Sequence, residues 1–185
     1  MVRSFKGIQT LTGASQPFFG TTMNAASTMQ VDPYTGNAGP GSRPSLSVVP
    51  VVSASGFMLN DRVIIAPKAN FVLKGVRDQG TVLAVDTVAN TITVQGLTGI
   101  HANGEFVVLN EDVTLVTLIP LSAGNPMYIG NDSTTGIASV AVIAVINQLI
   151  NRYDSPTAVG NSNKSSEFWV NGTAGDQFTA YMGVV

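Results

Sequence analysis

Hydrophobic and polar positions alternate with a period of two in several short stretches of the chain, which is the pattern of strands with one face buried. The clearest example is "GTVLAVDTVANTITVQGL", residues 80–97, in whose second half Ile92 and Val94 alternate with polar residues. Between the two halves lies "DTVANT", where Asn90 can adopt left-handed backbone angles at low cost. We therefore predict a β-hairpin with a short loop over 80–97.

Other runs rich in Val, Ile, Thr and aromatic residues also predict strands. They cover residues 46–52, 61–66, 70–76, 104–109, 113–119, 126–131, 136–146, 166–172 and 177–185. We expect 104–109 and 113–119 to form a second hairpin. For 136–146 we favour a long strand, although periodicity leaves a buried helix open. Many short strands with Gly, Asn, Asp and Pro at their ends predict an all-β barrel or sandwich.

The first 45 residues keep neither the strand nor the helix period. They are rich in Gly, Ser, Thr, Asn and Pro, and they carry scattered aromatic residues such as Phe18 and Phe19. The stretch "GNAGPGSRP", residues 36–44, is typical of a flexible or extended linker. A plain disordered tail would contain fewer aromatic residues. We therefore predict an extended N-terminal arm over 1–45 that orders on a partner, followed by a single β domain over 46–185.

The composition suggests a surface that partners cover. Charged residues make up 11% of the 185 residues, whereas about a quarter is usual in soluble domains. Because interface centres are depleted in charge, we expect a homo-oligomer, either a trimer or a dimer. The net charge of −2 argues against non-specific nucleic-acid binding. The chain has no apolar run that could span a bilayer and no signal-like start, so we expect a soluble product of the cytoplasm without a membrane partner.

The few charges are unevenly distributed along the chain. Arg62, Lys68, Lys74 and Arg77 fall close together, and acidic residues dominate from Asp78 to Asp132. One interpretation is that these charges only solvate the ends of loops. The other is that they form two complementary poles through which copies of the chain dock side by side. The sequence leaves both interpretations open.

Residues that carry catalytic or metal chemistry are scarce. The chain has no cysteine and one histidine, His101, which excludes thiolate catalysis, cysteine-ligated zinc and multi-histidine metal sites. His101 lies in the turn "TGIHANGE", where we interpret it as an exposed or hydrogen-bonded structural residue. A Ser-His-Asp triad is formally possible, but no "GxSxG" elbow accompanies it. We predict no catalytic, cofactor-binding or metal-ligating residues, and no cofactor.

Two acidic stretches are weaker candidates. "NDSTTG", residues 131–136, superficially resembles a calcium loop, but it supplies only the carboxylate of Asp132, so a hairpin turn is the better interpretation. Glu111 and Asp112 are adjacent. Neighbours on a strand point to opposite faces, so these carboxylates would share a catalytic proton only if a turn brought them together.

The arm, the low charge and the segments "DRVII" and "DQGTVLAVDTVANTITVQGL", residues 61–65 and 78–97, together resemble the capsid decoration, or cement, proteins of tailed bacteriophages. The resemblance is one of composition and segment order over most of the chain. It implies a jelly-roll or tulip-like β-barrel body. It also implies a place on the outer capsid surface, assembly in the host cytoplasm, and the major capsid protein as partner. No family residue is carried over to a position in this chain.

Two alternatives remain at this level. One is another virion part, such as a tail-tube, connector or fibre-base protein. The other is a carbohydrate-binding β module that uses Trp169, Tyr128 and Tyr181. Trp169 and its neighbour Phe168 could stack on a sugar or base. Because only Lys164 is basic nearby, packing in the core or in a subunit interface is the favoured interpretation.

Overall fold

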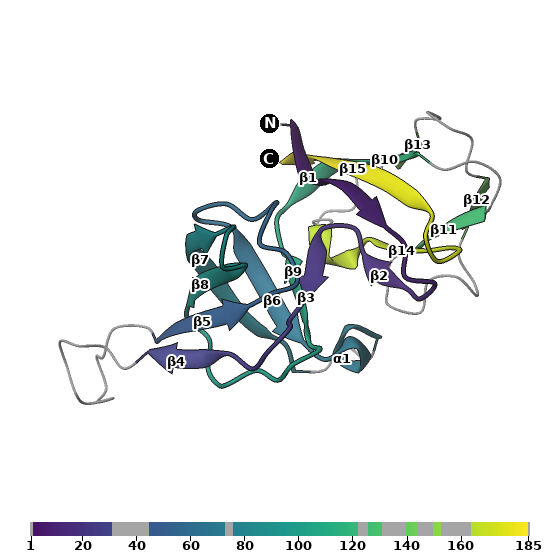
Figure 1. The fold of residues 1–185 in the computed structure, drawn as a ribbon. Coiled ribbons are helices and arrows are strands. Elements are labelled where there is room, and N and C mark those ends of the chain that lie inside the picture. The colour runs from purple at the N-terminus through teal and green to yellow at the C-terminus, as the bar shows by residue number, and fades with distance from the viewer. Residues whose placement is uncertain are drawn as a thin grey trace. The chain divides into compact units, whose positions relative to one another are not determined.

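The computed structural model describes residues 2–30, 45–72, 76–121, 126–130, 140–143, 150–152 and 164–184. Nearly all elements in these ranges are β-strands, which confirms the predicted all-β class (Figure 1). The contacts divide the chain into two compact units. Unit 1 combines Met1–Gly20 with Asn110–Val185, and unit 2 is Thr21–Leu109. Unit 2 is therefore inserted in the sequence of unit 1, a division different from the predicted boundary between residues 45 and 46.

In its described residues, unit 2 consists of one sheet and a single helical turn. The sheet has seven strands in the order β3-β9-β6-β7-β8-β5-β4, and its neighbours along this order are hydrogen-bonded. Its elements are β3 (Gly20–Thr22), β4 (Thr28–Gln30), β5 (Leu46–Pro50), β6 (Arg62–Ala66), α1 (Lys68–Val72), β7 (Asp78–Asp86), β8 (Thr91–Gln95) and β9 (Phe106–Leu109).

The sheet of unit 2 closes on itself. Strand β3 pairs with β9 on one edge. On its other side Met23 forms a bridge with Val51, and the Val52 N–H donates to the Thr22 carbonyl at 2.9 Å. Strand β4 continues the pairing with β5 further along. The segment 20–30 thus acts as one interrupted strand between β9 and β5 and completes a barrel, which removes most of the exposed sheet edge.

Alternation along the strands fills the barrel. In β5 and in β8 every second residue is buried, and Val49, Ile92 and Val94 are fully enclosed. The predicted hairpin over 80–97 is confirmed, because β7 and β8 pair antiparallel around a short turn. Asn90 in that turn has a φ of 52°, the left-handed conformation expected for it.

The strand predicted over 70–76 is wrong where the structure describes it. The residues after β6 form the single helical turn α1, and 73–75 lie outside the described residues. Pro67 follows β6 directly and has no N–H to continue the ladder. Its carbonyl instead accepts the Asn70 N–H at 3.0 Å, and Phe71 is buried. An apolar run of this length does not by itself distinguish a strand from a buried helical turn.

The described residues of unit 1 form two four-stranded sheets, in the orders β1-β15-β10-β13 and β12-β11-β14-β2. The chain ends meet in the first of them, where β1 and β15 pair antiparallel from Val2 opposite Gly183 to Thr10 opposite Gln177 (Figure 1). The elements are β1 (Val2–Thr10), β2 (Gln16–Pro17), β10 (Val113–Pro120), β11 (Pro126–Gly130), β12 (Val140–Ile143), β13 (Ile150–Arg152), the 3-10 turn η1 (Ser165–Glu167), β14 (Trp169–Asn171) and β15 (Gln177–Val184).

Aromatic side chains from distant parts of the sequence form the core of unit 1. Phe18 and Phe178 pack with ring centroids 6.0 Å apart, and Phe18 meets Phe19 edge to face at the same distance. All three are at most 1% exposed. The Phe18 N–H donates to the Phe168 carbonyl at 2.9 Å, so the segment after β2 is held by main-chain as well as side-chain contacts.

These contacts correct the predicted N-terminal arm. Residues 2–30 contribute β1, β2, β3 and β4, and Phe18 and Phe19 are core residues. The strand partners of this segment lie far away in sequence, so its local composition carries no trace of them. The linker predicted at 36–44 lies outside the described residues.

Two further expectations have different outcomes. The hairpin predicted from 104–109 and 113–119 is wrong, because β9 pairs with β3 and β6 whereas β10 pairs with β13 and β15. Alternation identifies both strands but says nothing of their partners. Of the stretch 136–146, β12 is a strand paired with β11, and the flanking residues lie outside the described part of the chain.

Candidate functional site

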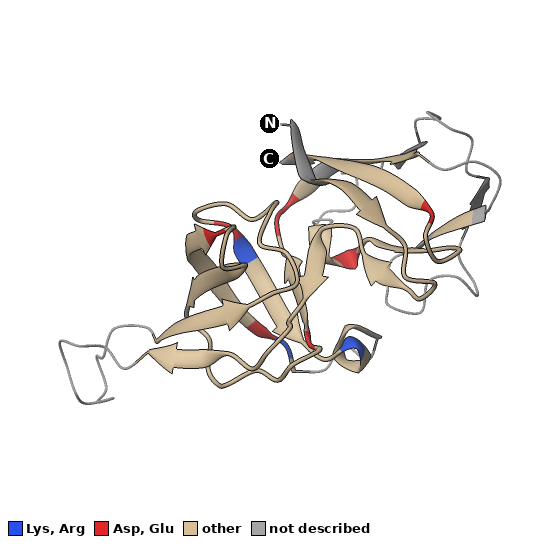
Figure 2. Ribbon diagram, viewed as in Figure 1, with Lys and Arg blue, Asp and Glu red and all other residues tan. Residues whose placement is uncertain are grey.

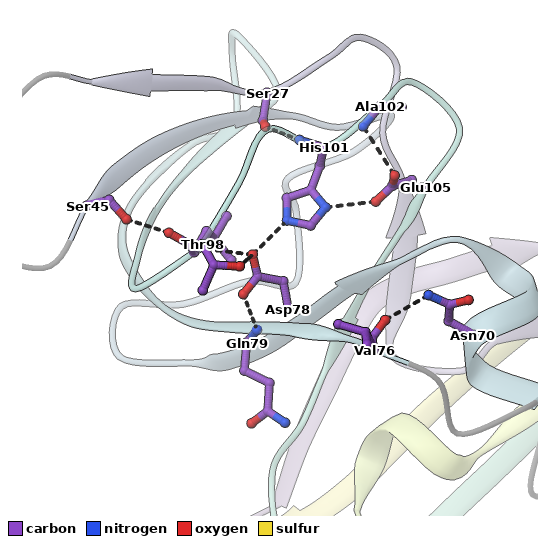
Figure 3. A network of polar contacts seen from close by, with 11 residues as sticks. Ser27, Ser45, Asn70, Val76, Asp78, Gln79, Thr98, His101, Ala102 and Glu105 are labelled. Atoms are coloured by element: carbon purple, nitrogen blue, oxygen red, sulfur yellow. Dashed lines mark hydrogen bonds and ion pairs between the residues drawn. The ribbon is translucent and has the colours of Figure 1, made fainter.

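Charged groups are sparse on the described ribbon of both units (Figure 2). Three titratable side chains meet around His101, which lies between β8 and β9 in unit 2. Its Nδ1 is 2.8 Å from Glu105 Oε2, and its Nε2 is 3.2 Å from Asp78 Oδ2 (Figure 3). The imidazole is only 11% exposed. Sequence reasoning missed both partners, although the i,i+4 spacing of His101 and Glu105 was a usable signal.

Hydrogen bonds from groups other than the imidazole hold the carboxylates of Asp78 and Glu105 in place. Asp78 Oδ2 accepts the Thr98 N–H at 2.7 Å and the Thr98 hydroxyl at 3.0 Å, and Asp78 Oδ1 accepts the Gln79 N–H at 3.0 Å. Glu105 Oε1 accepts the Ala102 N–H at 3.3 Å. Each carboxylate therefore reaches the ring from an anchored position.

The surroundings of Asp78 favour its ionised form. Burial alone would raise the pKa of this carboxyl, but the hydrogen bonds from Thr98 and the contact with His101 outweigh burial and hold the pKa below its ordinary value. Elsewhere in unit 2, burial lowers the pKa of the Lys68 ammonium at the start of α1.

This geometry suits a structural clamp better than catalysis. Both ring nitrogens of His101 face carboxylates, so neither is directed at a nucleophile. Ser27 Oγ accepts the main-chain N–H of His101 at 2.8 Å and does not contact the ring in any hydrogen bond the structure shows. One metal ion could not be bound by the imidazole and both carboxylates together, because Asp78 and Glu105 lie at opposite ring nitrogens. The described residues contain no group of three or more His, Asp and Glu arranged to hold a metal. Asp132 lies outside the described residues.

Glu111 and Asp112 do not form a shared acidic site in the structure. Asp112 forms a bridge with Lys164, whose Nζ is 2.5 Å from Asp112 Oδ1. Both side chains of this pair are partly exposed, and ion pairs in such positions stabilise little. Glu111 is tied through its main chain, since its N–H donates to Ser165 Oγ at 2.9 Å and its carbonyl accepts the Ser165 N–H.

Trp169 is a core residue, as the favoured interpretation of its sequence suggested. It is 1% exposed, and its indole Nε1–H donates to the Ser166 carbonyl at 3.1 Å. Phe168 is buried beside it in sequence. Tyr128 and Tyr181 are half-buried and belong to different sheets of unit 1. A sugar-stacking platform based on Trp169 is therefore ruled out by its burial.

Four large apolar residues are exposed on two loops of unit 2. Val52, Met58, Leu59 and Val88 are all more than half exposed, and Val88 at the tip of the β7–β8 hairpin is 93% exposed. We call these four residues the apolar loop surface. Residues 52–60 and 87–90, which contain them, include no Lys, Arg, Asp or Glu. Sequence reasoning missed this surface, because a lone Val in a polar turn gives no periodic signal.

Hydrogen bonds hold both loops in place. Asn90 joins them, because its carbonyl accepts the Val51 N–H at 2.9 Å and its Oδ1 accepts the Ala54 N–H at 3.1 Å. At the hairpin tip Asp86 Oδ1 accepts the N–H groups of Val88 and Ala89 at 2.9 and 2.8 Å. The apolar side chains are thus presented to solvent by ordered backbone, which lowers the entropic cost of binding a partner.

Compared with known protein families and with curated protein sequences, the chain matches none of them. Among solved structures it aligns with the VP16-VP17 complex, a complex of the two major capsid proteins of bacteriophage P23-77. The identity is 11% and the TM-score 0.19, over 100% of this chain and 72% of that chain. It also aligns with VP17, a capsid protein of the same phage, at 10% identity and a TM-score of 0.19, over 99% of this chain and 68% of that chain. A TM-score this low does not establish a shared fold.

No helix in the described part of the chain is both long and apolar enough to cross a membrane.

Proposed function

We propose that this chain is a structural protein of a phage virion, and more specifically that it decorates and stabilises the outer surface of a tailed-phage capsid. The observation that carries the proposal is the apolar loop surface: Val52, Met58, Leu59 and Val88 are exposed on loops that hydrogen bonds hold in place. Apolar patches on ordered loops are typical of protein–protein contact. The low charge of the whole chain and its resemblance in segment order to cement proteins support the same function.

Many weak contacts suffice for such a role. A protein attached in many copies to a regular lattice needs only modest affinity in each contact, because neighbouring attachments raise the effective concentration. The partner we propose is the major capsid protein, together with further copies of this chain in a trimer or dimer. The oligomer can be checked by analytical ultracentrifugation, and a strict monomer at high concentration would contradict that part of the proposal.

The function is tested by adding purified protein to undecorated, expanded capsids of the phage that encodes it. We expect saturable binding and a higher temperature of capsid disruption. The variant Val88→Asp places a charge in the apolar loop surface and should weaken binding about tenfold or more, because a charge in a desolvated contact costs at least about 1.4 kcal/mol. The matched control is Val76→Asp, since Val76 is 91% exposed and lies outside these loops.

Three outcomes distinguish decoration through the apolar loop surface, decoration through another surface, and a role as another virion part. Weak binding by the Val88 variant and normal binding by the Val76 variant support the apolar loop surface as the capsid contact. Equal binding by both variants contradicts that surface but leaves decoration itself standing. Protein that does not bind capsids and occurs only in tails contradicts decoration, and a role as another virion part then replaces it.

A further inference from the structure

The contacts of His101 depend on how many protons the imidazole carries. A doubly protonated ring has two N–H donors, whereas a neutral ring has one donor and one lone pair. Asp78 and Glu105 present acceptor oxygens to both nitrogens, at 3.2 and 2.8 Å. Both contacts are therefore hydrogen bonds only when the ring is doubly protonated. In the neutral ring one lone pair must face a carboxylate oxygen in a site that is largely shielded from water.

The ring lies where several segments of unit 2 are joined (Figure 3). The main chain of His101 is bonded to Ser27 in both directions, because its N–H donates to Ser27 Oγ and its carbonyl accepts the Ser27 N–H at 2.9 Å. Ser27 directly precedes β4. Glu105 also bonds through its main chain, and its carbonyl accepts the Met23 N–H at 2.8 Å. The segment 23–27, which links β3 to β4, is thus fastened to the β8–β9 connection near His101.

Two charged groups contact the ring in the described part of the chain. Asp78 comes from the start of β7, and Glu105 comes from the β8–β9 connection. Arg77 precedes Asp78 in the chain. Although burial would raise the pKa of Asp78, the hydrogen bonds from Thr98 and the contact with His101 hold it below its ordinary value, so the group beside Nε2 is an ionised acceptor.

We propose that His101 is a pH-sensitive latch of unit 2: its doubly protonated ring clamps Asp78 and Glu105 and so fixes the β8–β9 connection, whose main chain carries the hydrogen bonds to the segment 23–27. Loss of one proton breaks one of the two clamps and loosens this closure of the barrel beside β4. The rest of the barrel, including the β7–β8 hairpin, stays ordered, because its strands pair without any contribution from the ring. The latch does not depend on the proposed capsid function.

Amide hydrogen exchange on the full chain tests the latch residue by residue. Protection is measured at about pH 5.5 and about pH 8.5, on either side of the ordinary imidazole range, and is corrected for the intrinsic pH dependence of exchange. The amides of Ser27 and Gly104 report on the fastened segments, since they donate to the carbonyls of His101 and Met23. The amide of Val51, which donates to Asn90, is the internal control. The nitrogen chemical shifts of the His101 ring report its protonation in the same samples.

We expect the protection of Ser27 and Gly104 to fall about tenfold or more at the higher pH, and that of Val51 to change less than about twofold. The variant Glu105→Gln should keep the segments protected at both pH values, because a side-chain amide can accept from one form of the ring and donate to the other. Asp78→Asn provides the same test at the opposite nitrogen if the first variant folds poorly.

Several results would overturn the latch. One is a ring whose protonation does not change across this range. Another is a change in ring protonation that the protection of Ser27 and Gly104 does not follow. A third is a pH dependence that persists unchanged in Glu105→Gln and in Asp78→Asn, because it would then come from groups other than this cluster.

Discussion

Unit 1 and unit 2 are both all-β, but they assemble their sheets from different kinds of strand pair. In unit 2, β6, β7 and β8 form successive antiparallel pairs, whereas β5 pairs with β8, β9 pairs with β6, and the segment 20–30 closes the barrel. In unit 1 the central strand β15 pairs with β1 and with β10, so the first and last strands of the chain lie side by side. The strands of unit 2 thus pair within one continuous stretch of the chain, whereas unit 1 joins strands from the two ends of the sequence.

The two units differ in how far they depend on the N-terminal segment. Residues 1–20 supply β1 and the buried Phe18 and Phe19 to unit 1, whereas unit 2 is one continuous stretch, Thr21–Leu109. Non-local pairs form against a larger loss of chain entropy than local ones. We therefore expect unit 2 to be the more autonomous of the two.

The largest effect should follow from deleting residues 1–20. Unit 1 then loses a strand beside β15 and the aromatic residues that fill its core, so we expect it to unfold. Unit 2 should keep its cooperative transition. Two-dimensional NMR spectra of the deleted chain and of the fragment 21–109 give the comparison, and the dispersed peaks of the fragment should recur in the deleted chain. A fully dispersed unit 1 after the deletion would contradict the role assigned to β1 and Phe18.

Single core substitutions in the two units should cause smaller losses of stability than the deletion. Phe18→Ala removes a ring that packs on Phe178 and Phe19 and should lower the free energy of unfolding by about 3–5 kcal/mol. Ile92→Val in the barrel removes one methyl group and should cost about 0.5–1.5 kcal/mol. Urea denaturation followed by far-ultraviolet circular dichroism measures both losses, and the fluorescence of Trp169, which lies in unit 1, reports the first separately. Equal, small losses for both would mean that Phe18 is not a core anchor.

Replacing a glycine in β7 tests how closely β7 and β8 approach each other in the barrel. A Cβ at Gly80 would lie 2.4 Å from Val94 Cγ1 and 2.7 Å from the Gln95 carbonyl oxygen, so Gly80→Ala should destabilise unit 2 by about 1–3 kcal/mol. Gly99→Ala is the matched control, because no heavy atom lies within 4 Å of its Cβ position. A neutral Gly80→Ala in thermal denaturation would show that β7 and β8 can separate at no cost.

The sequence predicted well those features whose causes are local. The hairpin over 80–97 was predictable because both strands and the Asn90 turn lie within one window. The burial of Trp169 was predictable because only Lys164 is basic nearby, which argues against an exposed site where the ring stacks on a sugar or base. In each case the determining contacts are close in the chain or follow from residue type alone.

Features set by distant contacts were not predictable in the same way. The segment 1–30 looked like an arm because its partners, β15 and β5, lie elsewhere in the sequence. The hairpin predicted from 104–109 and 113–119 failed for the same reason, because β9 and β10 pair with strands that are distant in the sequence. His101 lies in the β8–β9 connection and the carboxylate of Asp78 comes from β7, and no spacing rule connects the two residues. Alternation indicates which face is buried but not which strand lies beside it.

Acid should weaken unit 2 through Asp78 more than unit 1 through Asp112. The pKa of Asp78 is depressed in the fold, so the unfolded chain takes up the proton first as the pH falls. Its contribution is present above about pH 4 and is lost as the pH drops through the folded-state value. Asp78→Asn should therefore cost about 1–2 kcal/mol at neutral pH and less in acid. Asp112→Asn, in a partly exposed pair, should change stability little. Urea midpoints at several pH values check both.

The smallest effect concerns a buried hydroxyl in the barrel. Ser47 is fully buried in β5, and its Oγ has no hydrogen-bond partner in the structure. Replacing an unpaired buried hydroxyl by a methyl group removes a desolvation cost, so Ser47→Ala should leave stability unchanged or raise it by up to about 1 kcal/mol. Thermal denaturation measures the change. A loss greater than about 1 kcal/mol would show that the hydroxyl is hydrogen-bonded in solution.

The proposal that the ordered loops of unit 2 bind a capsid is tested most directly by oxidative footprinting of two methionines. Met58 belongs to the apolar loop surface and is 54% exposed, and Met29 in β4 is 42% exposed and serves as the internal reference. Oxidation of each is measured by mass spectrometry in the free protein and in capsid-bound protein. We predict that binding slows the oxidation of Met58 about tenfold or more while changing Met29 far less, because burial at an interface excludes the oxidant. Equal oxidation of Met58 in the free and bound states would contradict the account.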